Sequence, residues 1–248
     1  VYKRQVYICR KDRTDKEPPA LIAKLLGYGV LSCLPAIVVE LILSAIIERL
    51  NVRNVYLGYF LEAFVVAGLT EETCKFLFLR TTWRNPAFDY QFDAIVYAVM
   101  VALGFAAFEN VKYVYSYGFA TGIVRAVTAV PGHAIFGVFM GYFYGYAKLS
   151  DYWGRDDDRK AYLALSVVVP VLMHGCYDFL AFTQESDSRF TLLFYAYLVA
   201  LYVFGIRRVN RSSRDDRRVT RETVFDYFRR MQYPMPPQYR DRNDDFWR

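Results

Sequence analysis

The chain has 248 residues and a formal net charge of +6; 55% of its residues are hydrophobic and 23% are charged. The charged residues gather near both ends and in short connections, and long apolar runs separate them. A water-soluble fold made of such runs would have almost no polar surface, which argues against a soluble protein. The four cysteines form no CxxC pair, which argues against a zinc finger or a disulfide framework.

Six apolar runs are each close to the ~20 residues that a helix needs to cross ~30 Å of hydrocarbon. In chain order they are Leu25–Ile47, Leu57–Leu79, Phe92–Tyr115, Thr121–Ala147, Ala161–Phe182 and Phe190–Ile206. They predict an all-α, polytopic transmembrane helix bundle of about six spans, and therefore a multi-pass protein of the cell membrane.

The rest of the chain is expected to flank this bundle. Residues 1–24 form a charged cytoplasmic lead-in, residues 25–206 the transmembrane domain, and residues 207–248 an Arg-rich cytoplasmic tail. Within the tail, a short amphipathic helix near Val219–Met231 could lie on the lipid surface.

Lysine and arginine residues in the connections predict the orientation, because positively charged loops stay in the cytoplasm. With the lead-in inside, the basic loops around Arg80 and across Lys148–Lys160 also face the cytoplasm, as do twelve arginines from Arg207 onward. Both termini are therefore predicted to be cytoplasmic. Topology and attraction to the lipid bilayer account for the basic excess, so no nucleic-acid partner is expected.

An ionisable side chain at mid-bilayer costs at least ~2.5–3.5 kcal/mol, so each one inside a span is a candidate functional residue. Four consecutive spans carry such residues at a similar predicted depth: Glu71, Glu72 and Lys75 in the second, Glu109 in the third, His133 in the fourth, and His174 with Asp178 in the fifth. This convergence predicts one site in the bundle interior. Three further charges near span ends, Glu40, Glu62 and Arg125, are expected to snorkel or pack.

Helical spacing predicts how some of these residues interact. Glu71 and Lys75 are four residues apart and can pair, while Glu72 is turned by about 100° and can address another partner. His174 and Asp178 have the same spacing, by which a carboxylate can orient an imidazole.

Two kinds of hydrolysis are open to such a set. His133, His174 and one carboxylate, for which Glu109 is the candidate, could bind Zn²⁺ while a second glutamate acts as general base. Alternatively, a buried glutamate could activate water without a metal, while histidine and asparagine groups stabilise the oxyanion. No HExxH motif is present, so the metal hypothesis rests on residue types alone.

At these residues the chain resembles the PrsW family of intramembrane proteases, itself similar to the wider group of CAAX prenyl endopeptidases and bacterial Abi proteins. The matching motifs, in order, are Glu71-Glu72-x-x-Lys75, Phe105-x-x-x-Glu109, the lone His133 and His174-x-x-x-Asp178. The similarity runs from the Asp12–Pro18 lead-in through the sixth span. Family members usually carry a helix before this lead-in, so a truncated or altered start is expected.

The resemblance implies an intramembrane endopeptidase that cleaves a membrane-anchored protein. The expected partner is a single-span membrane protein substrate, for example an anti-sigma factor in signalling by regulated proteolysis. The resemblance implies that Glu71, Glu72 and His174 are most directly catalytic. It also implies that the other four motif residues, His133, Glu109, Asp178 and Lys75, belong to the same site.

Two other classes of function are also considered. A proton- or ion-coupled transporter could use a buried Glu/His relay, but internal repeats or broken helices would then be expected, and neither is visible in the sequence. A non-catalytic membrane scaffold would depend on the basic tail instead of the buried carboxylates.

Overall fold

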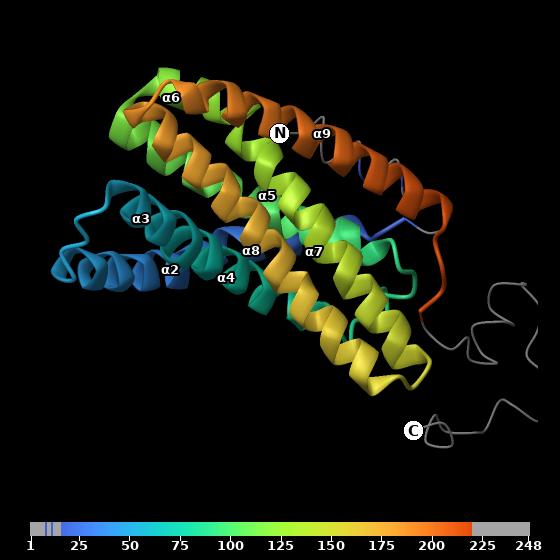
Figure 1. Ribbon diagram of the computed structural model, residues 1–248. Coiled ribbons are helices and arrows are strands. Elements are labelled where there is room, and N and C mark those ends of the chain that lie inside the picture. The colour runs from blue at the N-terminus through green and yellow to red at the C-terminus, as the bar shows by residue number, and fades with distance from the viewer. Residues whose placement is uncertain (1–7, 9–10, 12–15, 220–248) are drawn as a thin grey trace, which may run out of the picture.

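The computed structural model describes residues 8, 11 and 16–219, whose helices pack side by side in a bundle (Figure 1). Among these residues, five helical stretches are long and apolar enough to cross a membrane. They are α2 (Pro19–Arg49), α5 (Asp93–Tyr117), α6 with α7 (Phe119–Val127 and Ala129–Tyr152), α8 (Asp156–Ser186) and α9 (Arg189–Arg214). The described residues form no β-sheet, only an isolated bridge between Tyr90 and Arg218. The predicted all-α membrane fold is confirmed.

The second predicted span is also present, but it is not one uniform α-helix. It consists of α3 (Val55–Phe60), the π-helix η1 (Leu61–Leu69) and α4 (Thr70–Leu79), and it ends in the short 3₁₀ turn η2 (Arg80–Thr82). Glu71 and Glu72 follow directly after the π-helix. Such segments are rare and frequently lie at functional sites, where they change the direction in which the next side chains point.

The fourth predicted span is broken at Thr128, where α6 ends and α7 begins. Pro131 lies in the first turn of α7, a position where the missing N–H would have had no partner within the helix. His133 is half a turn further on. A broken helix at the site, which was not visible in the sequence, is therefore present, so helix continuity does not separate a protease from a transporter.

The sixth helix is longer than its predicted apolar span. α9 continues past Ile206 to Arg214, and residues 215–219 then return to the start of α5. There the backbone N–H of Gln91 donates to the Arg217 carbonyl at 2.8 Å, and that of Val219 donates to the Asp89 carbonyl at 2.8 Å. The amphipathic helix predicted near Val219–Met231 falls, apart from its first residue, outside the described residues.

α5 lies at the centre of the bundle, with every residue from Asp93 to Ala106 buried. Small residues allow its neighbours to come close: a Cβ on Gly29 of α2 would collide with the α5 backbone, and a Cβ on Gly104 would collide with the α2 backbone. A small residue is also needed on α7, because a Cβ on Gly145 would lie only 2.6 Å from the Gln91 carbonyl oxygen. Such contacts replace the hydrophobic effect as the main attraction between helices in lipid.

The helix connections lie at two opposite ends of the bundle (Figure 1). The α2–α3, α5–α6 and α8–α9 connections lie at one end, which we call the α2–α3 end. The α7–α8 connection and the end of α9 lie at the other, the α7–α8 end. That the α7–α8 end faces the cytoplasm stays a prediction from the loop charges.

Candidate active site

Lys75 lies at the centre of the predicted polar cluster and is only 1% exposed. Its ammonium donates hydrogen bonds to Glu71 Oε2 at 3.1 Å, Glu72 Oε1 at 2.7 Å and His133 Nδ1 at 3.0 Å. The predicted Glu71–Lys75 pair is confirmed. Glu72 also pairs with Lys75, because three- and four-residue spacings both lie on one helix face, and it addresses a different partner as well, His174 on α8.

Each histidine is held between the cluster and a second carboxylate. His174 directs Nδ1 to Glu72 Oε1 at 2.9 Å and Nε2 to Asp178 Oδ2 at 3.2 Å, which confirms the predicted contact with Asp178. His133 directs Nδ1 to Lys75 and Nε2 to Glu109 Oε2 at 2.9 Å. A carboxylate on one ring nitrogen fixes the ring's orientation and leaves the other nitrogen for chemistry. In both rings that other nitrogen, Nδ1, faces the cluster.

Arg125 belongs to this network although it was expected to snorkel or pack near a span end. Its guanidinium lies 2.8 Å from Glu109 Oε2 and stacks 3.7 Å above the Tyr113 ring. The break at Thr128 makes α6 a separate short helix that carries Arg125 next to α5. The sequence contained a signal for this pair, because an ionisable residue inside a membrane span usually pairs with another, and Glu109 is the acid of the preceding span.

The cluster forms because η1 and α8 approach closely. A Cβ on Gly68 of η1 would lie 3.1 Å from the Val171 carbonyl oxygen, and one on Gly175 would collide with the Phe64 ring. The contact is therefore tight at Gly68 and leaves no room for a Cβ at Gly175 unless the Phe64 ring moves. It brings the start of α4, with its two glutamates, beside His174 on α8.

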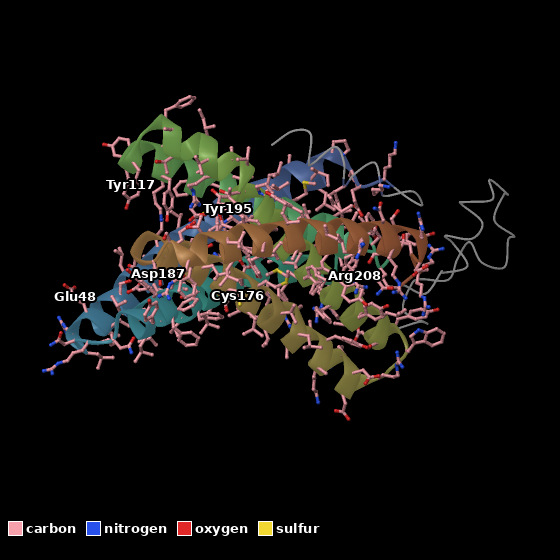
Figure 2. The ribbon with its side chains drawn as sticks, turned by 45° about the horizontal axis from the view of Figure 1, so that its top comes forward. Glu48, Tyr117, Cys176, Asp187, Tyr195 and Arg208 are labelled. Carbon is pink, nitrogen blue, oxygen red and sulfur yellow. The ribbon has the colours of Figure 1, made fainter. Side chains whose placement is uncertain are left out.

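The cluster opens into a cavity of about 380 Å³ between α2, η1, α5, α6, α7 and α8. Glu71, Glu109, His133 and His174 line it, whereas Glu72 and Lys75 do not. Residues that line the rest of the cavity extend along the helices toward the α2–α3 end: Glu40, Ser44, Glu62, Lys112 and Phe182. Figure 2 shows this end of the bundle, where Glu48, Tyr117 and Asp187 are labelled.

Four of the residues offer a set of metal ligands. One atom each from Glu71, Glu72, His133 and His174 lies within 4.8 Å of all the others, and imidazole with carboxylate is the ligand type of hydrolytic zinc sites. Glu72 Oε2 is buried without a hydrogen-bond partner in the described part of the chain, so an acceptor is left over. The donor set therefore fits a divalent cation, which would replace or accompany the Lys75 ammonium. Glu109 is not in this group, and its role as a ligand stays a prediction.

The geometry defines a class of protein. Carboxylates paired with oriented imidazoles, at the inner end of a cavity and surrounded by membrane-spanning helices, are equipped for acid–base hydrolysis within a membrane. The fold and this site together describe a membrane-embedded hydrolase.

Comparison with known proteins makes the assignment specific. The family described as PrsW family intramembrane metalloprotease matches residues 17–206. Protease PrsW of Bacillus subtilis (strain 168) is 34% identical over 207 residues, which are 83% of this chain and 88% of that protein. Protease PrsW of Oceanobacillus iheyensis is 35% identical over 208 residues (84% and 89%), and that of Clostridioides difficile is 30% identical over 218 residues (86% and 88%).

The chain therefore belongs to the PrsW family of intramembrane metalloproteases. It is an intramembrane protease of the cell membrane, and neither the transporter nor the scaffold interpretation is favoured. No solved structure matches the chain.

Proposed function

We propose that this protease cleaves a single-span membrane protein, with Glu71 as the general base and with Glu72, His133 and His174 as the residues that would hold a zinc ion. One observation carries this division of roles. Glu71 lines the cavity together with both histidines, whereas Glu72 lies behind them and contacts Lys75 and His174. A general base has to contact the water that attacks the substrate, whereas a side chain that only binds the metal does not.

In the proposed reaction, the Glu71 carboxylate accepts a proton from water as the water oxygen bonds to the carbonyl carbon of the scissile peptide. The proton then passes to the peptide nitrogen, the C–N bond breaks, and a carboxylic acid and an amine leave. When bound, zinc would supply Lewis-acid stabilisation of the charge that develops on the carbonyl oxygen.

The remaining polar residues act in this proposal by positioning. Glu109 and Asp178 hold the His133 and His174 rings at Nε2. Arg125 holds Glu109 in turn. Lys75 allows two carboxylates to be buried side by side, because an unpaired buried charge would be strongly destabilising.

The path of the cavity supports cleavage in the half of the membrane nearer the α2–α3 end. Its lining runs from the cluster toward residues Ser44, Lys112 and Phe182. With the predicted orientation, that half is the external one. A single-span substrate would enter there, and an anti-sigma factor, the substrate implied by the family resemblance, is of this kind.

Cleavage of a tagged single-span reporter protein, co-expressed with the full chain, tests the proposal. Glu71→Gln and His174→Ala should each lower the cleavage rate about 100-fold or more, because general acid–base groups contribute about 10²–10⁴-fold. Glu48→Gln is the matched control, since Glu48 is exposed at the end of α2 and lies outside the cavity. With equal amounts of each variant in the membrane, wild-type cleavage by Glu71→Gln would refute its role as the base.

The metal is tested separately on purified protein. Chelation should abolish cleavage of the reporter, zinc should restore it, and His133→Ala should lower the zinc content measured by mass spectrometry. Undiminished cleavage by protein shown to be free of metal would exclude zinc and leave the carboxylate mechanism.

A further inference from the structure

A second polar cavity, of about 260 Å³, lies away from the active site. It is formed by the start of α5, the last turns of α7, the end of α9 and the segment that follows α9. It shares no lining residue with the catalytic cavity. In Figure 2, Arg208 of this cavity is labelled toward the end opposite Glu48, Tyr117 and Asp187.

The cavity is lined by three arginines and one acid. Arg208, Arg211 and Arg217 face it together with Asp215, whose carboxylate lies 3.6 Å from Arg211 in an exposed pair. Arg208 and Arg217 have no carboxylate within ion-pair distance in the described part of the chain. The lining therefore has an excess of positive charge, and two guanidinium groups keep their donors free for a ligand.

The Arg208 side chain and the backbone that carries Arg217 are held in place before any ligand arrives. The Arg208 guanidinium lies 4.0 Å above the ring of Tyr142, which fixes it against α7. The segment that carries Arg217 is tied to the start of α5, because the Gln91 N–H donates to the Arg217 carbonyl at 2.8 Å. The Phe92 N–H also donates to Asp216 Oδ1 at 2.9 Å. A preorganised site loses less entropy on binding, so these contacts favour a ligand.

The chemistry of the lining selects the ligand. Guanidinium groups present planar pairs of donors that match the oxygens of a phosphate group. The cavity also lies just past Ile206, where the apolar run of α9 ends and, in the predicted topology, the cytoplasmic headgroup layer begins. Basic pockets between helices on this side of a membrane are suited to anionic headgroups.

We propose that the cavity between α5, α7 and α9 binds a phosphate group, held by Arg208 and Arg217, at the membrane boundary. The group is supplied either by an anionic phospholipid or by a soluble phosphate. In either case it bridges α9 and the segment after it to the rest of the bundle, and binding stabilises the folded protein by mass action.

Thermal unfolding of the full chain in uncharged detergent tests the proposal. Phosphatidylglycerol, diacylglycerol with the same acyl chains, and inorganic phosphate are each titrated at constant ionic strength. We expect phosphatidylglycerol to raise the unfolding midpoint and diacylglycerol not to do so. Stabilisation by inorganic phosphate, with competition between the two, assigns the site to soluble phosphate; a response to the phospholipid alone assigns it to a headgroup.

Two double variants show whether the arginines carry the effect. Arg208→Gln/Arg217→Gln should weaken half-saturation about tenfold or more, because charge-assisted hydrogen bonds to the phosphate group are lost. Arg207→Gln/Arg214→Gln removes the same charge from exposed positions of α9 outside the cavity and should bind like the wild type. Arg217→Gln alone keeps the backbone contacts to α5, so it gives a folded variant in which binding is still weakened.

Three results would overturn the proposal. They are no stabilisation by either phosphate source, equal stabilisation by diacylglycerol, and equal responses of the two double variants. The last would mean that general surface charge attracts the anion.

Discussion

Replacing Lys75 with methionine removes the ammonium at the centre of the active site and keeps much of the apolar length of the side chain. Glu71 and Glu72 then lose the cation that lies 3.1 and 2.7 Å from their carboxylates, and His133 loses a donor. Removing one partner of a buried ion pair costs about 3–5 kcal/mol, because the remaining charge is uncompensated. For a chain of this size, we expect the unfolding midpoint to fall by about 6–20 °C.

Far-UV circular dichroism of the purified protein in uncharged detergent measures this shift. Lys112→Met is the matched control, because Lys112 is exposed at the same cavity, and its effect should stay within about 0.5 kcal/mol. The triple variant Glu71→Gln/Glu72→Gln/Lys75→Met should recover much of the loss, since no member of the ion-paired group is then charged. The reasoning is refuted if Lys75→Met unfolds like the wild type, or if the triple variant is no more stable than Lys75→Met.

Two further substitutions test positioning and packing. Asp178→Asn should lower the cleavage rate about 10–100-fold with little change in stability, because the carboxylate that orients the His174 ring is lost; Asp187→Asn, outside the cavity, is the control, and equal rates would contradict this role. Gly29→Ala should destabilise the protein by about 1–3 kcal/mol, because its Cβ would meet the α5 backbone. Gly27→Ala meets nothing within 4 Å and should be neutral, so similar melting of both variants would disprove the close helix crossing.

The membrane-spanning helix bundle and the motif residues of the polar cluster could be predicted from the sequence, because both follow from the cost of placing charge in hydrocarbon. The breaks in the helices could not be predicted from the sequence. Pro35 and Pro170 lie inside α2 and α8, which continue through them, whereas Pro131 lies next to a true break. Proline in an apolar run therefore does not by itself mark a helix start in a membrane.

Contacts within one helix were predictable and contacts between helices were not. The spacing of four residues predicts the pairs of Glu71 with Lys75 and of His174 with Asp178. The contact of Glu72 with His174 depends instead on how closely η1 and α8 approach, a distance that spacing along the chain does not encode. The same reason applies to Arg125, whose partner lies on another helix.

The π-helical segment also makes the active site sensitive to the length of the chain. Each residue of an α-helix turns the backbone by about 100°, so the direction of Glu71 relative to α3 depends on how many residues Leu61–Leu69 contains. Such segments arise from an α-helix by insertion of a residue, so deleting one residue there would let the segment relax to an α-helix and leave the glutamates near their present direction. Inserting a further residue has no such compensation and would rotate both glutamates away from His133 and His174. A one-residue insertion would thus inactivate the enzyme while leaving every motif residue in the sequence intact.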